Sequence, residues 1–268
     1  MEKYKLKDFT FIIPIRVDSI ERLENVIAVT SYLSQYFETN IYLLEAATRN
    51  NSLLKTLLGK DIEYYYLEDH DTIFYKTKYI NILSRKVKTQ FMAIWDADVI
   101  TDPQQIINAV EKLRNNEADM AYPYNGVFLE CSEIIRSLYL DKKDIGVLHR
   151  YSHMMNLPYG NSLKSGTVLL NLEKFVESGM TNEKFYGWGN EDYELYHRSK
   201  VLGYKIFSSN GPIFHLSHPR DQNGRFRSSN QVNWTRSQLN MVINSSKEDL
   251  RSLIIRNLPD SVDLLERN

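Results

Sequence analysis

Short apolar runs alternate with segments of helical periodicity over residues 1–115, and this alternation limits the folds open to the chain. The apolar runs begin at Phe9, Ile41, Ile62 and Phe91, and amphipathic segments lie between them. Parallel strands need a crossover connection, usually a helix, whereas antiparallel strands can be joined by a short turn. The alternation therefore predicts a Rossmann-like α/β fold, with a mainly parallel central sheet and helices on both faces.

The same patterns give the expected extent of each element. Strands are expected at 9–15, 41–44, 62–67, 91–95, 120–130, 167–172, 205–208 and 212–216. Helices are expected at 19–37, 52–58, 72–86, 102–113, 132–140, 173–178, 191–202 and 234–257. Segments 142–165, 182–190 and 217–230 lack periodicity and are expected to be loops. Without repeats or a linker, the chain is predicted to be one continuous domain over 1–268.

Composition and charge narrow the class of protein. Hydrophobic residues make up 43% of the chain, and the net charge of -1 gives no support for a nucleic-acid partner. The single cysteine, Cys131, excludes an internal disulfide and a cysteine-based zinc site. No apolar run reaches roughly 18 residues, and no signal-like segment precedes the first strand, so a cytoplasmic enzyme without a transmembrane segment is expected.

Two carboxylates follow a buried strand in the sequence FMAIWDADV at 91–99. Asp96 and Asp98 stand where a central strand opens into a loop, which is where open α/β sheets bind ligands. Oxygen ligands of this kind suit a hard divalent cation such as Mg²⁺ or Mn²⁺. A solvated turn after a strand is the alternative, because Asp-x-Asp triplets also arise by chance.

Two histidines after another strand could face the same ion. His215 and His218 are separated by three positions at the end of the expected strand 212–216. At the end of the first strand, Pro14 and Arg16 stand where a nucleotide would lie, although a surface arginine is the simpler interpretation.

The segment YGWGNEDYE at 186–194 places an aromatic side chain between two glycines and then two carboxylates at the start of a helix. Carboxylates at a helix start are favoured by the helix dipole, so capping alone would explain Glu191 and Asp192. Capping does not explain Trp188 between Gly187 and Gly189, whereas a hinged lid does.

These motifs resemble those of GT-A-fold glycosyltransferases, most closely the β-1,4-galactosyltransferase family and its bacterial relatives, over residues 11–220. Residues 12–16 (IIPIR) together with 21–23 are similar to the family's opening motif, I-I-P-F-R-x-R-x-E-x-L. Residues 71–74 (DTIF) together with Lys78 and Asn81 are similar to its helix motif, D-T-I-F-N-R-A-K-L-L-N. Asp96-Ala97-Asp98 occupies the position of the family's D-V-D motif. Residues 187–192 (GWGNED) occupy the position of G-W-G-G-E-D, and residues 218–221 (HPRD) that of H-S-R-D. Five motifs in the same order at compatible spacing make the resemblance specific.

The chain also departs from that pattern. Tyr75 and Lys76 replace Asn and Arg in the nucleotide helix, and Asn190 replaces the second glycine of the lid pair, which predicts a stiffer lid. His215 stands where animal members have Met, so the metal shell is expected to be richer in nitrogen. Ser165-Gly166 stands where the family has Gly-Gly in the sugar pocket.

The resemblance implies a GT-A fold and an inverting, metal-dependent enzyme that uses a UDP-sugar and a glycan or glycolipid acceptor. It divides the chain into a nucleotide-binding half (1–115), an acceptor and metal half (116–230) and a C-terminal helical extension (231–268). The implied roles are nucleotide-sugar binding by Pro14, Arg16, Phe74, Lys78, Asp96 and Leu163; binding of Mn²⁺ or Mg²⁺ by Asp98, His218 and His215; acceptor binding by Glu191, Trp188 and Gly166; and general-base catalysis by Asp192.

In the family, an aromatic residue before the Gly-Gly pair favours galactose. Leu163 stands there, so UDP-GalNAc or UDP-GlcNAc is expected over UDP-Gal. The expected role is synthesis of a surface polysaccharide or glycolipid, which is compatible with peripheral contact with a membrane.

Two other classes are considered. A sugar-nucleotide nucleotidyltransferase normally needs a Gly-rich phosphate loop, which the segment 14–19 lacks. A non-catalytic carbohydrate-binding protein would need Trp188 but not Asp98 with His218.

Overall fold

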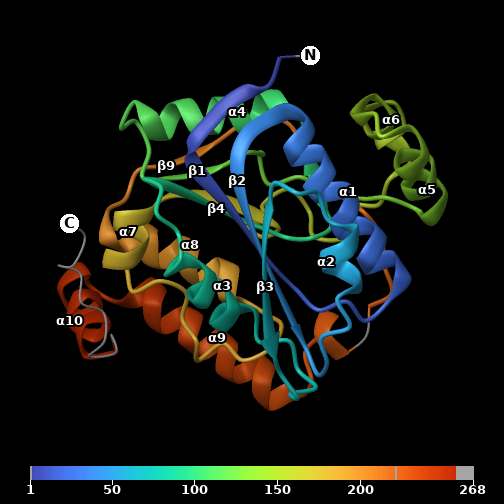
Figure 1. Cartoon of the computed structure of the whole chain (residues 1–268). Coiled ribbons are helices and arrows are strands. Elements are labelled where there is room, and N and C mark those ends of the chain that lie inside the picture. The colour runs from blue at the N-terminus through green and yellow to red at the C-terminus, as the bar shows by residue number, and fades with distance from the viewer. Residues whose placement is uncertain (1, 221, 258–268) are drawn as a thin grey trace.

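The computed structural model describes residues 2–220 and 222–257. Its centre is a seven-stranded sheet in the order β3-β2-β1-β4-β8-β6-β9, with helices on both faces (Figure 1). The strands are β1 (Tyr4–Ile15), β2 (Phe37–Ala47), β3 (Ile62–Glu68), β4 (Phe91–Trp95), β6 (Met120–Tyr122), β8 (Thr167–Asn171) and β9 (Ile206–Ser208). Strands β1 to β4 pair in parallel, and only β8 runs antiparallel to its neighbours, so the prediction of a mainly parallel α/β sheet is confirmed.

Side-chain alternation along β1 explains why both faces of the sheet are covered. Phe11 and Ile13 join an apolar cluster with α1 and α4, whereas Ile12 joins a second cluster with α3 and α8. Successive residues of a strand point to opposite faces, so a strand that is apolar at every position must be covered twice. The helices are α1 (Ile20–Tyr36), α2 (Leu53–Leu57), α3 (Lys76–Ser84), α4 (Pro103–Arg114), α5 (Glu133–Lys142), α6 (Ile145–Arg150), α7 (Leu172–Glu177), α8 (Glu191–Leu202), α9 (Ser229–Asn244) and α10 (Lys247–Asn257), with the 3₁₀ helices η1 (Ser152–Met154) and η2 (Gln222–Gly224).

A second, three-stranded sheet lies at the end of β4. Its order is β5 (Val99–Thr101), β10 (Ile213–His215) and β7 (Phe128–Glu130), with β10 antiparallel to β5 and parallel to β7. The register places His215 opposite Val99 on one side and opposite Glu130 on the other. The Leu216 amide also donates to the carbonyl of Asp98 over 2.8 Å. This sheet therefore brings the end of β10 beside the Asp-x-Asp turn.

Several predicted elements were wrong in extent: the strand expected at 9–15 begins at Tyr4, and the strand expected at 41–44 spans Phe37–Ala47. The expected strand 120–130 is two strands in different sheets, β6 and β7, because Pro123 cannot donate to a ladder and Gly126 has φ of 97°. The expected helix 72–86 begins at Lys76, since Asp71 accepts the Ile73 amide and Asn223 accepts the Phe74 amide in the turn before it.

The segment 142–165 is not a plain loop, because it contains α6 and η1, and Asp144 caps α6 through the Gly146 amide. The expected helix 234–257 is split into α9 and α10, since Ser245 is extended and Ser246 caps the second helix through the Asp249 amide. Residues 258–268 of the predicted C-terminal extension lie outside the described residues. Within the described part, no helix is long and apolar enough to cross a bilayer.

A buried ion pair in α8 supports the helix that begins with Glu191 and Asp192. Arg198 donates to Glu194 at 3.0 Å, and the two side chains are only 4% and 3% exposed. The same guanidinium donates to the carbonyls of Ser178 and Met180. Arg198 therefore holds α8 against the turn after α7.

Replacing Arg198 with Met should lower the free energy of unfolding by about 3–5 kcal/mol, because Glu194 would remain as an unpaired buried charge. Urea denaturation measures this change. Lys174→Met is the matched control, because it breaks the exposed Lys174–Glu177 pair, and it should cost less than about 1 kcal/mol. Equal losses in the two variants would contradict the assignment of Arg198 as a buried support.

Candidate active site

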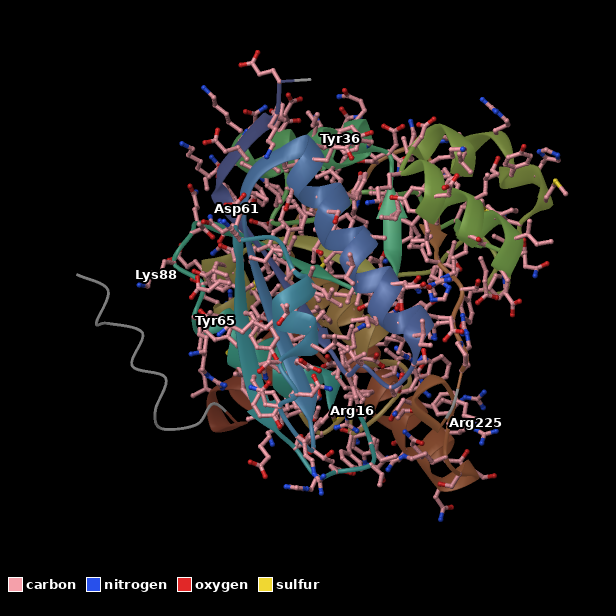
Figure 2. The ribbon with its side chains drawn as sticks, turned by 45° about the vertical axis from the view of Figure 1, so that its right-hand side comes forward. Arg16, Tyr36, Asp61, Tyr65, Lys88 and Arg225 are labelled. Atoms are coloured by element: carbon pink, nitrogen blue, oxygen red, sulfur yellow. The ribbon has the colours of Figure 1, made fainter. Side chains whose placement is uncertain are left out.

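A cavity lies at the carboxyl ends of β1 and β4, where the two predicted halves meet. Figure 2 shows Arg16, just after β1, at the opposite end of the molecule from Tyr36 at the end of α1. Two of the predicted site residues, Lys78 and Gly166, do not line the cavity. The others do, and they are Pro14, Arg16, Phe74, Asp96, Asp98, Leu163, Trp188, Glu191, Asp192, His215 and His218. Residues separated by up to 204 positions are therefore brought into one site.

Three potential metal ligands form a cluster on one side of the cavity. Asp98, His215 and His218 each offer one ligand atom, and these atoms lie within 4.8 Å of one another. His218 Nε2 lies 3.1 Å from one carboxylate oxygen of Asp98, and His215 Nε2 lies 3.7 Å from the other. His218 Nδ1 is 2.9 Å from the Pro219 carbonyl, to which it can donate while Nε2 stays free to bind a metal. The predicted ligands do converge.

The electrostatics of this cluster fit a bound cation. Burial of Asp98 would raise its pKa, but the two imidazoles hold the pKa of that carboxyl well below its usual range. Burial of His215 disfavours its charge, yet Asp98 and Glu130 raise the pKa of the imidazole to about 9. An anionic oxygen and two nitrogens within reach of one point suit Mn²⁺ and other divalent transition metals. The residues present therefore fit the metal that the resemblance implies.

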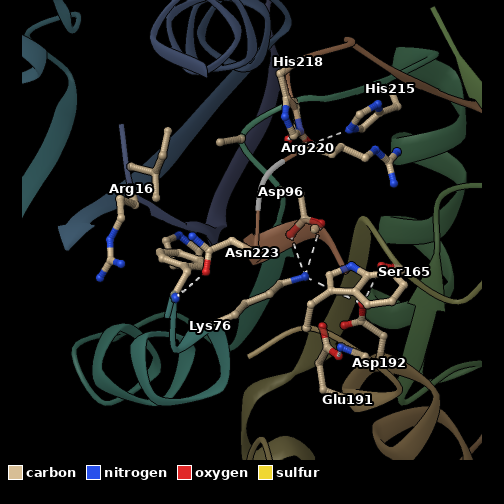
Figure 3. A pocket seen from close by; sticks show the side chains of 18 of the residues that line it. Arg16, Lys76, Asp96, Ser165, Glu191, Asp192, His215, His218, Arg220 and Asn223 are labelled. Atoms are coloured by element: carbon tan, nitrogen blue, oxygen red, sulfur yellow. Dashed lines mark hydrogen bonds and ion pairs between the residues drawn. The ribbon is translucent and has the colours of Figure 1, made fainter. Parts of the chain in front are cut away.

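A lysine joins the carboxylates on the other side of the cavity. Lys76 Nζ lies 2.9 Å from Asp96 and 3.7 Å from Asp192, and Figure 3 shows it between the two. Burial works against its charge, but Asp192, Asp96 and Glu191 raise the pKa of Lys76 above its usual value. Burial, together with Asp98 and Asp192, raises the pKa of Asp96 to about 6, although Lys76 opposes this shift. One cation thus balances several crowded carboxylates.

Glu191 and Asp192 point to different partners, as expected for neighbours on a helix. The Gly189 amide donates to Glu191 over 2.9 Å, so Glu191 supports the Gly-Trp-Gly loop. Ser165 Oγ donates to Asp192 over 2.5 Å, and Lys76 lies on the same oxygen. Burial and the charge of Asp192 raise the pKa of Glu191 to about 7. The two carboxylates are therefore held by different partners.

The Gly-Trp-Gly segment depends on backbone conformations that favour glycine. Gly187 and Gly189 have φ of 82° and 125°, and a Cβ at Gly189 would lie 2.3 Å from the ring of Phe226. The Trp188 and Phe226 rings meet edge to face at 5.1 Å. Asn190, at φ of 63°, donates to Thr235 of α9 over 3.0 Å. These contacts tie the segment to α9.

On the nucleotide side, Arg16 is fixed by two backbone carbonyls. It donates to Ala46 over 3.0 Å and to Asp71 over 2.7 Å, and its guanidinium lies 5.9 Å from the centre of the Phe74 ring. Its remaining nitrogen, Nη2, is buried without a hydrogen bond, although it lies 3.9 Å from a carboxylate oxygen of Asp69. This nitrogen therefore keeps hydrogen-bonding capacity beside an aromatic ring.

The two predicted residues outside the lining have other contacts. The Lys78 ammonium lies 5.9 Å from the centre of the Tyr75 ring, and the Gly166 carbonyl accepts the Asp96 amide over 2.8 Å. Asp221 of the predicted HPRD segment lies outside the described residues.

Sequence reasoning missed several residues of the lining. Lys76 was noted only as a replacement, although a cation at a family Arg position was a usable signal. Tyr159 lies in the segment expected to be a loop, and Asn223 and Phe226 lie in the polar loop after His218. None of these three stands in a motif, so only the folded chain places them.

Comparison with known proteins identifies the fold. A family model described as the N-terminal domain of galactosyltransferase matches residues 148–220. No curated protein matches the chain in sequence. The catalytic domain of Drosophila β1,4-galactosyltransferase 7 in complex with xylobiose aligns at a TM-score of 0.55 and 16% identity, covering 87% of this chain and 79% of that one.

Two bacterial structures share the architecture. Mycobacterium tuberculosis glucosyl-3-phosphoglycerate synthase aligns at a TM-score of 0.51 and 14% identity, covering 94% of this chain and 81% of that one. S. aureus TarS aligns at a TM-score of 0.54 and 12% identity, covering 92% of this chain and 69% of that one. The fold is therefore that of the GT-A glycosyltransferases, and the chain is similar to the β-1,4-galactosyltransferase family.

The raised pKa of Glu191 gives the metal-free chain a pH-dependent stability. The pKa of this carboxyl is about 4.5 in the unfolded chain and about 7 in the folded chain, so its stabilisation is complete below pH 4.5 and is lost as pH rises through 7. Glu191 alone should contribute a fall of about 2 kcal/mol in the free energy of unfolding between pH 5 and 8, in addition to the falls from Asp96 and His215. Glu191→Gln should make the total fall smaller by that amount, whereas the exposed Glu173→Gln should leave it unchanged. Denaturation with urea across pH measures both, and an unchanged pH profile in Glu191→Gln would contradict the buried position of the carboxyl.

Proposed function

We propose that the chain is an inverting, metal-dependent glycosyltransferase that moves a sugar from a UDP-sugar to a hydroxyl of a glycan or glycolipid acceptor. One observation carries the proposal: the three-ligand cluster at Asp98 and the carboxylate pair at Glu191 and Asp192 line the same cavity. A sugar nucleotide bound between them would have its diphosphate at the cluster and its reacting carbon toward the carboxylates. We expect the surrounding pathway to be cytoplasmic synthesis of a surface polysaccharide or glycolipid.

Residues 1–115 are proposed to bind the nucleotide. Pro14, Arg16 and Phe74 would hold the uridine half, and the Arg16 nitrogen that makes no hydrogen bond in this structure would donate to an oxygen of the ligand. Asp96 would contact the ribose or a metal-bound water. Lys78 faces Tyr75 in this structure and would act only after its side chain turned.

Asp98, His218 and His215 are proposed to hold Mn²⁺ or Mg²⁺ beside the diphosphate. A divalent cation there would act as a Lewis acid that offsets the charge of the departing UDP. Solved relatives support this assignment. Drosophila β1,4-galactosyltransferase 7 has been solved with manganese, UDP-Gal and xylobiose, and the mycobacterial synthase with Mn²⁺, UDP-Glc and phosphoglyceric acid.

Residues 116–230 are proposed to bind the acceptor, with Trp188 and Glu191 against its sugar ring and Gly166 shaping the wall behind them. Asp192 would accept the proton of the reacting hydroxyl, whose oxygen forms a bond to C1 as the bond from C1 to the phosphate oxygen breaks. The electron pair of the broken bond leaves with UDP. Attack from the face opposite the leaving group inverts C1 without a covalent intermediate.

A panel of sugar nucleotides tests the proposed function. UDP release should require Mn²⁺ or Mg²⁺, and kcat/KM should be higher for UDP-GalNAc or UDP-GlcNAc than for UDP-Gal, because Leu163 in the wall leaves room for an N-acetyl group. Asp98→Ala and His218→Ala should abolish metal-dependent release while the chain stays folded. Full activity of both variants in chelator-treated buffer would refute the metal assignment, and a strong preference for UDP-Gal would refute the role of Leu163.

The base assignment is tested by two isosteric substitutions. Asp192→Asn keeps the size of the side chain and its hydrogen bond from Ser165 but removes the basic oxygen, so kcat should fall at least about 10²-fold with UDP-sugar binding nearly unchanged. Glu191→Gln should act mainly on the KM for the acceptor. If Asp192→Asn keeps near-normal kcat while Glu191→Gln is inactive, the two roles are exchanged.

A further inference from the structure

Glu130 lies directly behind a proposed metal ligand, and no motif marks it. It ends β7, and the register of β7 with β10 pairs it with His215. The Cys131 amide donates to the His215 carbonyl over 2.9 Å, and the Glu130 amide donates to the Asn156 carbonyl over 2.9 Å. The backbone of Glu130 is therefore fixed from both sides, next to His215.

The imidazole of His215 has one nitrogen toward each of two carboxylates. Nε2 lies 3.7 Å from Asp98 Oδ1, on the side of the three-ligand cluster, and Nδ1 lies 3.5 Å from Glu130 Oε1. The His215 side chain is only 7% exposed, and Nδ1 is buried without a hydrogen bond. A buried donor without a partner costs about 1–3 kcal/mol, so a small approach to Glu130 would be favourable.

The surroundings hold both the ring and the carboxylate in this arrangement. The centre of the His215 ring lies 5.0 Å from that of the Phe128 ring and 5.2 Å from that of the His218 ring. Arg220 donates to Glu130 Oε1 over 2.7 Å and also contacts the Tyr159 hydroxyl. Figure 3 shows Arg220 close to His215 and His218 at the same side of the cavity. Arg220 thus holds the same Glu130 oxygen, Oε1, that faces Nδ1 of His215.

We propose that Glu130 is the positioning residue of the metal site: it accepts a hydrogen bond from Nδ1 of His215, which fixes the ring with Nε2 toward the metal. Histidines that bind metals commonly donate their other ring nitrogen to a carboxylate, which sets the tautomer and makes the ligand more basic. This inference rests on the proposed metal site. Glu130 would act on the metal through His215 and would not itself be a ligand.

The inference can be tested without measuring enzyme activity. Mn²⁺ alone is titrated into the full chain, and the EPR signal of the free ion reports how much is bound. Glu130→Ala should weaken Mn²⁺ binding about 10–100-fold. Glu130→Gln should lie between Glu130→Ala and the native chain, because an amide oxygen can still accept from Nδ1. Asp8→Ala is the matched control, since it removes a carboxylate from an arginine pair near the opposite end of β1, and it should leave Mn²⁺ affinity unchanged.

A double-mutant cycle separates positioning from a general charge effect. In a His215→Ala background, Glu130→Ala should change Mn²⁺ affinity less than about 2-fold, because the residue it acts through is gone. Losses that add would show an independent ligand or a long-range charge and would overturn the proposal, as would unchanged affinity in Glu130→Ala. Thermal unfolding in the presence of a chelator checks that each variant is folded. If Glu130→Ala does not fold, Glu130→Gln takes its place in the Mn²⁺-binding test.

The cycle also distinguishes this inference from the proposed function. If Asp98→Ala loses Mn²⁺ binding while Glu130→Ala retains it, only the role of Glu130 is wrong. If the native chain does not bind Mn²⁺, or Asp98→Ala binds it equally well, the metal site of the proposed function and the inference both fail.

Discussion

The pairing of β10 with β5 is the interaction on which the site depends. It is a short antiparallel ladder, yet it places His215 opposite Val99, one residue after Asp98. The hydrogen bond from the Leu216 amide to the Asp98 carbonyl continues the ladder to the turn itself. Because backbone bonds set this register, a carboxylate and an imidazole more than a hundred positions apart meet with little freedom. The seven-stranded sheet ends at the turn that carries Asp98, and the three-stranded sheet brings His215 to that turn.

Charge balance is the second constraint on the cavity. Asp98 is balanced by two imidazoles, whereas Asp96, Asp192 and Glu191 share Lys76. Buried like charges repel strongly, so the raised pKa values of Asp96 and Glu191 follow from having one cation for several carboxylates. A bound diphosphate and its metal would change this balance on both sides at once. The cavity therefore has one cluster balanced by imidazoles and a second cluster balanced by a single lysine.

The sequence was sufficient where the chemistry sits at the end of a regular element. Asp98 follows an apolar strand, and Asp192 starts a helix with clear bounds, so both could be placed from pattern alone. Lys76 could not, because Asx turns and Asn223 delay α3 by one turn and redirect its first residues. Tyr159 and Glu130 depend on pairing between distant strands and on helices within 142–165, and no local periodicity reports those contacts.

The hydrogen bond between Asn190 and Thr235 connects α9, near the C-terminus, to the segment that carries Glu191 and Asp192. Gln231 of α9 also donates to the Trp188 carbonyl over 3.1 Å, and Arg227 donates to the Tyr186 carbonyl over 2.8 Å. The segment that carries Glu191 and Asp192 is therefore braced by residues beyond every recognised motif. A fragment that ended after His218 would keep each predicted side chain of the cavity but lose this brace. The part of the chain that holds Glu191 and Asp192 in place therefore extends into α9.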